Sequence, residues 1–208
     1  MPFIIGRKIE MSQQFNEDGT VVPVTLVKAE PNIVTQVRTQ EKDGYTAVQL
    51  GVDNAKKLNK AEQGHLHDLV PVKTLREFRV DETELVRGEK ISVEDFTPGM
   101  RVSIVGFSKG RGFAGVVKRH GFKGQKATHG TKDQIRMPGS IGSQRQGKVI
   151  KGQRMAGRMG GDRVTVKNLE IVSTDPTTNI IAIKGAVPGA RGSLVYIKST
   201  EHETIWQA

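Results

Sequence analysis

The feature that most constrains this chain is a basic, glycine-rich block from Ser108 to Arg163. Its 56 residues contain 14 Lys or Arg against two acids, Asp133 and Asp162, giving a local net charge of +12, whereas the whole 208-residue chain carries +10. The block holds 13 of the 24 glycines and only 14 apolar residues. So little apolar surface cannot offset the entropy lost when a chain becomes ordered. We therefore predict an extension that is disordered in the free protein and is ordered by a partner.

The charge pattern indicates what that partner is. Cations are spaced from Lys109 to Arg163, so only a long anionic partner can match them all, and a polyphosphate backbone has this property. A solvated basic tail is the alternative, but such tails are usually terminal and monotonous, whereas this block is internal and mixes Arg and Lys with Gly, Pro, Phe and Met. An anionic membrane is disfavoured because the block lacks an amphipathic helical period. We expect it to penetrate a folded RNA.

The rest of the sequence predicts a mainly β fold. β-branched runs bounded by turn residues predict strands at residues 3–11, 21–29, 33–39, 45–52, 75–80, 91–93, 100–107, 163–172, 180–187 and 194–199. Many short strands without alternating helices favour a barrel or a sandwich. We predict one β-barrel domain made of residues 1–107 and 163–208 together, with residues 108–162 as a long irregular loop.

Turn and helix signals divide these strands. Pro31-Asn32 and Asp175-Pro176 predict turns, and Asp43-Gly44 predicts a hairpin. One short helix is expected within 59–70, because Asn59 is a favourable N-cap and Glu62 follows three residues later. The acidic run 81–84 predicts an exposed turn.

Two near-matches to phosphate-binding motifs lie in the block. Gly110–Gly115 fits G-x-G-x-x-G, but residues 116–124 include two β-branched residues and two more glycines, and only Asp133 follows as an acid, so a dinucleotide site is disfavoured. Residues 142–149 resemble a P-loop, but Val149 stands where a Ser or Thr must bind Mg²⁺. We therefore expect no nucleotide hydrolase.

Catalytic and metal sites are not expected either. The chain has no cysteine, and His65 and His67 with Asp68 lack a third or fourth ligand and diverge on a helix. His120 and His129 are better placed to donate to phosphate or to stack on a base. No base and orienting acid accompany the serines of the block, Ser108, Ser140 and Ser143.

Membrane association and export are not expected from the sequence. The N-terminal run MPFIIGRKIEM is too short for a signal peptide, and no apolar stretch is long enough to span a membrane. The residues of the block are suited to binding. Arg and Lys can bind phosphate, and glycine lets the backbone approach a phosphate closely. Phe113, Phe122 and the methionines offer apolar surface for bases or for neighbouring proteins.

Several long motifs carry a family resemblance. FSKGRGFAGVVKRHGFKG (107–124), ATHG (127–130), PGSIG (138–142), GKVIKGQRMAGRMG (147–160) and RVTVKNLEIV (163–172) resemble, in this order, the bacterial large-subunit ribosomal protein L three family. GRKIEMSQQFNEDGTVVPVTLV and IKGAVPGARGSLVYIK fit as well, so that the resemblance spans nearly the whole chain.

The resemblance implies a translation-protein-type β-barrel and a loop that runs through ribosomal RNA toward the peptidyl-transferase centre. It also implies early binding during subunit assembly, neighbouring ribosomal proteins as partners, a cytoplasmic location in the ribosome, and no enzymatic activity, cofactor, small-molecule substrate or membrane. The loop tip is expected near residues 142–151. The candidate rRNA-binding residues are Lys109, Arg111, Lys118, Arg119, Lys123, Lys126, His129, Lys132, Arg136, Gln144, Arg145, Lys148, Lys151, Arg154, Arg158 and Arg163.

The sequence departs from the family pattern at one place. Where many members read N-Q-T-P-G, this chain reads Ser143-Gln144-Arg145-Gln146-Gly147, and Gln144 and Gln146 are candidates for the methylation known in some members. Two other functions stay open at this point. One is a nucleotide-binding factor that uses the same barrel, and the other is an assembly chaperone that visits RNA transiently.

Overall fold

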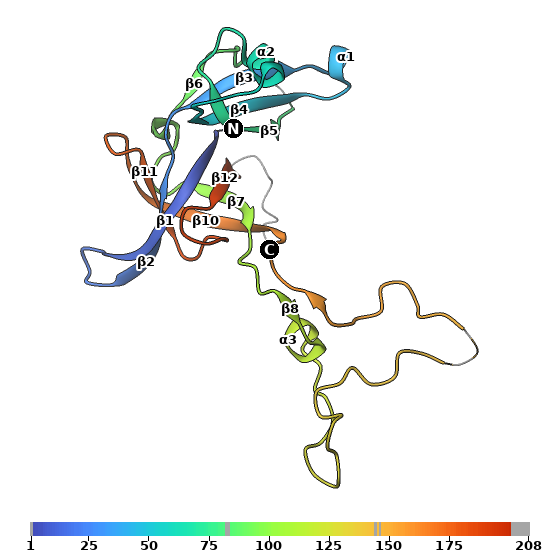
Figure 1. The fold of residues 1–208 in the computed structure, drawn as a ribbon. Helices are drawn as coiled ribbons and strands as arrows, with labels where there is room; N and C mark the ends of the chain where they lie inside the picture. The colour runs from blue at the N-terminus through green and yellow to red at the C-terminus, as the bar shows by residue number, and fades with distance from the viewer. Residues whose placement is uncertain (1, 82–83, 144, 146, 201–208) are drawn as a thin grey trace. The chain divides into compact units, whose positions relative to one another are not determined.

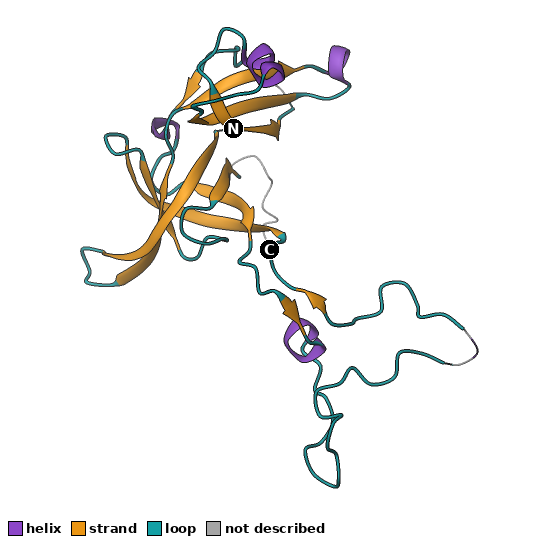
Figure 2. Cartoon of the chain, in the orientation of Figure 1, coloured by secondary structure: helices purple, strands orange, loops and turns teal. Residues whose placement is uncertain are grey.

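The structure is a computed structural model that describes residues 2–81, 84–143, 145 and 147–200 (Figure 1). It is mainly β, as predicted, with few and short helices (Figure 2). The elements in chain order are β1 (Phe3–Phe15), β2 (Val21–Lys28), β3 (Asn32–Arg38), α1 (Gln40–Asp43), β4 (Ala47–Asn54), α2 (Lys60–Leu66), β5 (Val72–Arg79), β6 (Lys90–Ile91), the 3-10 helix η1 (Val93–Asp95), β7 (Arg101–Phe107), β8 (Phe113–Ala114), α3 (Val116–His120), β9 (Gly157–Arg158), β10 (Arg163–Asp175), β11 (Ile180–Lys184) and β12 (Leu194–Ser199).

The chain divides into two compact units, one comprising Met1–Phe107 with Arg163–Ala208 and the other Ser108–Asp162. Six strands of the first unit close a barrel in the order β1-β12-β7-β10-β11-β2, with all neighbours antiparallel. Inward-facing residues such as Ile4, Ile104, Ile181 and Ile197 fill it, and Phe96 from beside η1 joins the same cluster. Because closure removes free strand edges, this barrel needs no further strand.

A second sheet of the same unit has the order β5-β4-β3-β6 and packs on the outside of β1 and β12. Alternation along β1 explains this, since Ile4 faces the barrel interior while Phe3 and Ile5 face the second sheet. The Phe3 and Phe78 rings stack with centroids 4.7 Å apart. A strand buried on both faces reads as a continuous apolar run, as Phe3-Ile4-Ile5 does.

Hydrogen bonds also join the two sheets. Asn32 is fully buried, accepts from the backbone N–H of Ile5 at 2.9 Å, and donates to the carbonyls of Ile5 at 3.1 Å and Glu30 at 2.7 Å. The Asn32 side-chain amide thus makes, with Ile5 of β1, the two hydrogen bonds that a backbone amide of a neighbouring strand would otherwise make.

Not every strand of residues 1–107 and 163–208 belongs to the barrel, because β3 to β6 form the second sheet. The hairpin predicted at Asp43-Gly44 is confirmed, because β3 and β4 pair antiparallel with Arg38 opposite Ala47. Residues Gln40–Asp43 form a helical turn that Gly44 caps with φ 76°, and β4 begins only at Ala47. Alternating hydrophobicity predicts that a segment is a strand, but it does not say which strand lies beside it.

The remaining boundaries differ modestly from those predicted. The capping box of Asn59 and Glu62 is present, but α2 ends at Leu66, before Pro71. β1 continues to Phe15 rather than Met11, because its last residues pair with β2. β11 ends at Lys184, and Val93 belongs to η1 rather than to a strand. The turn predicted at 81–84 includes Glu82 and Thr83, which lie outside the described residues.

Candidate nucleic-acid interface

The unit Ser108–Asp162 begins and ends in a hydrogen-bonded stem, which we define as residues 108–121 and 155–162. The Ser108 N–H donates to the Asp162 carbonyl at 2.9 Å, and the Arg111 N–H donates to that of Met159 at 2.8 Å. Farther along, β8 and β9 pair with Phe113 opposite Arg158. The stem is therefore more regular than the irregular loop expected from the glycine content.

The short helix α3 closes the far end of the stem. Val116 is buried and starts the helix, and three basic residues occupy its last turn. The Arg119 guanidinium donates from Nη1 to the carbonyl oxygen of Met155 at 2.7 Å. His120 Nε2 lies 3.1 Å from the same oxygen and must donate, because a carbonyl only accepts. One ring nitrogen of His120, a residue predicted to donate to phosphate or to stack on a base, therefore holds the stem.

Residues 122–154, which we call the distal loop, carry most of the remaining cations. A hydrogen bond from the Gln125 N–H to the Ile135 carbonyl, at 3.0 Å, closes a smaller loop within it. His129 lies exposed in this smaller loop with φ 58°. Several apolar side chains of the distal loop are also exposed: Ile135, Met137, Ile141, Val149 and Ile150.

The structure places all but one of the predicted basic residues on one unit, but it does not gather them into one cluster. Lys109 and Arg111 precede β8, Lys118 and Arg119 lie on α3, and Arg158 lies on β9. Arg163 begins β10 in the other unit. Gln144 and Gln146, the two methylation candidates, lie outside the described residues. The distal loop carries Lys123, Lys126, His129, Lys132, Arg136, Arg145, Lys148, Lys151 and Arg154.

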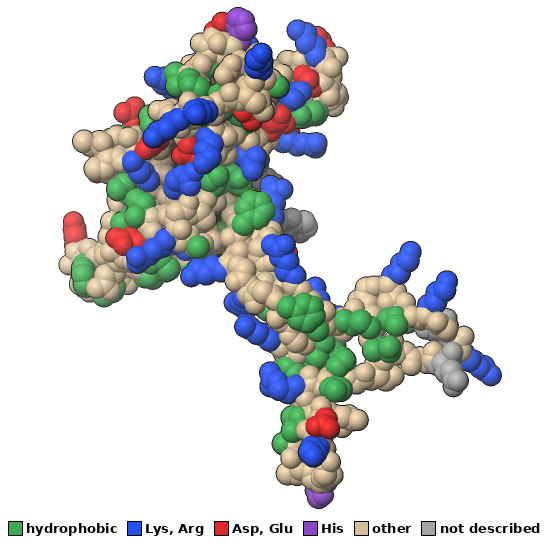
Figure 3. Space-filling view, in the orientation of Figure 1, with side chains coloured by type: hydrophobic (Ala, Val, Ile, Leu, Met, Phe, Trp, Pro, Cys, Tyr) green, Lys and Arg blue, Asp and Glu red, His purple; other side chains and the backbone are tan. Residues whose placement is uncertain are grey.

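The cations of the block share one property, which is the lack of a described acidic partner. All 14 Lys and Arg residues of the block are exposed, and within the described ranges none of them makes an ion pair. Figure 3 shows blue side chains projecting at intervals along the loop. By contrast, the Arg38 guanidinium in β3 binds Asp43 at 2.6 Å and Glu77 at 2.9 Å, and these hydrogen bonds raise its pKa.

Comparison with known proteins decides the family. The sequence pattern described as Ribosomal protein L3 matches residues 77–178. A large ribosomal subunit protein uL3 from Chloroflexus aggregans is 58% identical over 201 residues, which are 94% of this chain and 96% of that protein. The uL3 protein of Acidothermus cellulolyticus is 48% identical over 202 residues, covering 94% of this chain and 91% of that protein.

The chain belongs to the ribosomal protein L3 family. This confirms the family assigned from the motifs of the basic block and its flanking strands.

The G-x-G-x-x-G match of this L3-family chain does not lead into a long helix. Gly115 precedes a helix of only five residues, which is too short to present the N-terminus of a dinucleotide site. Among the residues the structure describes, no three His, Cys, Asp or Glu side chains come together to hold a metal ion. His65 instead lies 2.8 Å from the Gln49 amide oxygen. No helix within the described ranges is long and apolar enough to cross a membrane.

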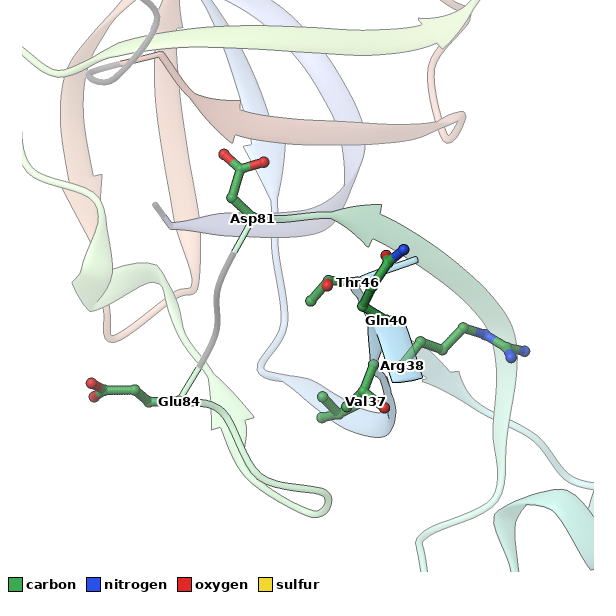
Figure 4. A pocket seen from close by; sticks show the side chains of 7 residues that line it. Val37, Arg38, Gln40, Thr46, Asp81 and Glu84 are labelled. Carbon is green, nitrogen blue, oxygen red and sulfur yellow. The ribbon is translucent and has the colours of Figure 1, made fainter. Parts of the chain in front are cut away.

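A pocket of about 620 Å³ lies in the barrel unit and is lined by Val37, Arg38, Thr39, Gln40, Thr46, Asp81 and Glu84. Its charged side chains do not converge, because Figure 4 shows Arg38, Asp81 and Glu84 pointing in different directions. The Arg38 guanidinium is already paired with Asp43 and Glu77. The described side chains that line this pocket therefore do not bring charged groups together.

Reasoning from sequence missed the stem. The two segments of the stem lie far apart in the chain, so no local sequence pattern marks their pairing. The glycines of the stem were the available sign that two backbones pass close to each other there. At Gly160, φ is +77° and an added Cβ would lie 2.2 Å from the Lys109 carbonyl oxygen. Only glycine fits such a position.

Proposed function

We propose that this L3-family protein is a structural constituent of the large ribosomal subunit that binds its rRNA directly through the basic unit. One observation carries the proposal: all 14 cations of the block are exposed, and in the described part of the chain none has an acidic partner. Such a concentration of like charge repels itself in the free protein. An RNA backbone removes that repulsion and releases its own counterions.

The two units differ in how they become ordered. The barrel unit has two apolar clusters, neither of which includes a residue of 108–162. It can therefore fold before RNA is present, whereas the distal loop gains its order from rRNA. A chain with a folded anchor and an RNA-ordered arm suits early binding to the large subunit, and we propose that it helps to nucleate assembly.

We propose further that the distal loop reaches toward the peptidyl-transferase centre, with its tip near residues 142–151, and shapes RNA there without performing chemistry. Family membership and the exposed cations Arg145, Lys148 and Lys151 support this position. Neighbouring ribosomal proteins are the expected partners of the barrel unit. Methylation of Gln144 or Gln146 belongs to the same proposal and is tested by peptide mass spectrometry of purified subunits.

The RNA-binding proposal is tested by two matched triple substitutions in the full-length protein. One is Lys148→Gln/Lys151→Gln/Arg154→Gln in the distal loop, and the control is Lys56→Gln/Lys57→Gln/Lys60→Gln in the barrel unit. Affinity for transcribed large-subunit rRNA is measured over a range of salt concentrations. Log K falls as log salt rises, and each lost phosphate contact makes this slope shallower by roughly 0.7–0.9. The magnitude of the slope should therefore be smaller by about 2 in the loop variant. Equal effects of both variants would contradict the proposal.

A second experiment separates a subunit constituent from a transient assembly factor. In cells, residues 123–153 are replaced by a short Gly-Ser linker, which keeps the stem bonds to Met155. Sucrose gradients at high salt then locate the intact and the shortened chains. A constituent stays with mature large subunits, whereas intact chain found only on immature particles would favour the assembly factor.

A further inference from the structure

Phe113 is the most exposed of the large hydrophobic side chains that the structure describes. It is 81% exposed, compared with 66% for Phe15 and 46% for Phe107. Phenylalanine is ordinarily among the more buried residues. Among the described residues no aromatic ring lies against Phe113, although the nearby ring of Phe122 does approach His120 at 5.9 Å. The ring is thus presented to a partner rather than stored in a core.

The backbone beneath this ring is firmly held. Phe113 begins β8, and its strand neighbour Ala114 points the other way and is only 3% exposed. Just before it, the Met159 N–H donates to the Gly112 carbonyl at 2.9 Å. A phenyl ring has only two side-chain torsions, so a fixed backbone leaves it little freedom to lose on binding.

Basic residues lie near the Phe113 ring in the chain or across the β8–β9 pair, but none is described as stacking on its face. Arg158 lies directly opposite Phe113 in the β8–β9 pair, and facing residues of paired strands share one side of the ribbon. Its guanidinium lies back over Gly161, since a Cβ added there would be 2.8 Å from Arg158 Nη2. No cation–π contact within the described ranges involves Phe113. Arg158 and Arg111 are both exposed, and neither has an acidic partner among the residues that the structure describes.

We propose that Phe113 is a stacking platform for an unpaired nucleobase of the rRNA, with Arg111 and Arg158 holding the adjacent phosphates. This inference rests on the proposed function and adds a site that reads the flat face of a base rather than the charge of the backbone. The local net charge of +12 favours a nucleotide over an apolar side chain of a neighbouring protein.

The test compares Phe113→Leu, which removes the ring but keeps apolar bulk, with Phe113→Trp, which keeps a stacking face. Phe15→Leu is the control, since Phe15 is exposed in the other unit. Full-length proteins bind transcribed large-subunit rRNA over a salt series, and ultraviolet cross-linking followed by mass spectrometry locates the residue in contact with RNA. Thermal unfolding verifies that each variant folds.

Loss of one stacked base weakens binding about tenfold, so we expect this for Phe113→Leu, with an unchanged salt slope because no charge is removed. Phe113→Trp should bind within about twofold of the parent, on the same stacking argument. Phe15→Leu should bind like the parent, and a nucleotide should cross-link to Phe113.

Parental affinity in Phe113→Leu, or equal weakening by Leu and Trp, would overturn the inference. Normal binding of Phe113→Leu to RNA together with loss of a neighbouring protein from subunits would assign the ring to that protein instead. Failure of the parent itself to bind rRNA in a salt-dependent way would refute the proposed function, and that result is distinguishable from a defect of one variant.

Discussion

At the scale of single residues, the stem depends on positions where two backbones nearly touch. Gly160 is such a position, because its added Cβ would meet the backbone carbonyl of Lys109, which cannot move aside as a flexible side chain could. Gly112, which also lies in the stem, has a similar φ, +67°, but open space around an added Cβ. The pair separates the effect of crowding from that of backbone conformation.

We therefore expect Gly160→Ala to destabilise the stem more than Gly112→Ala does. A left-handed conformation costs an alanine about 1–2 kcal/mol at either site, and the clash adds to this only at Gly160. Hydrogen exchange of the Arg111 amide, which is bonded to Met159, measures the stem directly. Equal exchange rates in the two variants would show that the Lys109 contact has no effect.

Asp175 provides a pH-dependent contribution at the β10–β11 turn. Its pKa lies below the ordinary value of 3.8, chiefly because the Thr178 hydroxyl donates to the carboxylate and also because the Thr177 N–H does. A carboxyl with a lowered folded pKa stabilises the fold above its unfolded pKa and loses this contribution as pH falls through the folded value. Asp175→Asn should thus be less stable than the parent at neutral pH, and the difference should shrink below about pH 4. Urea unfolding at several pH values measures it, and a constant difference would exclude this linkage.

At the scale of elements, the sequence predicts local structure well and partners poorly. The capping box at Asn59 and Glu62 is a local signal and is confirmed, as are most strands. The second sheet was not foreseen: the Asp43-Gly44 turn predicts that β3 and β4 pair, but nothing in these two strands says that the pair lies outside the barrel. The doubly buried run Phe3-Ile4-Ile5 was the available sign that β1 has a layer on each side.

Asn32 joins these layers, so its removal should weaken both. Asn32→Ala leaves the N–H and carbonyl of Ile5 buried without their side-chain partners. We expect a loss of about 2–4 kcal/mol in the free energy of unfolding, since each unsatisfied buried group costs about 1–3 kcal/mol. Urea denaturation measures this loss. Asn54→Ala at the exposed end of β4 is the control and should change stability by less than about 0.5 kcal/mol.

At the scale of the whole molecule, the basic block was identifiable from its charge, and its boundaries coincide with the ends of the barrel strands β7 and β10. The charge of the block predicts an anionic partner, but it does not say which cations also serve the stem, as Arg119 does. It also could not reveal the exposure of Phe113, which depends on strand pairing. Such long-range pairing is set by the fold and not by local sequence.

Replacing residues 123–153 with a short Gly-Ser linker should leave the stability of the barrel unit unchanged. Its apolar clusters contain no residue of that range, so calorimetry should give the same unfolding temperature, within about 2 °C, for the intact and shortened proteins. Intact protein without RNA serves as the reference. A markedly lower unfolding temperature in the shortened protein would mean that the loop contributes to the barrel.

The register of the barrel has a consequence for how such proteins diversify. Phe107 and Arg163, the residues on either side of the insertion, are already paired across β7 and β10. The barrel thus fixes the two ends of whatever segment lies between them, and the entropy of closing that segment grows only slowly with its length. Arms can lengthen, shorten or be exchanged at this junction during evolution without disturbing the scaffold, and the same junction can accept grafted peptides.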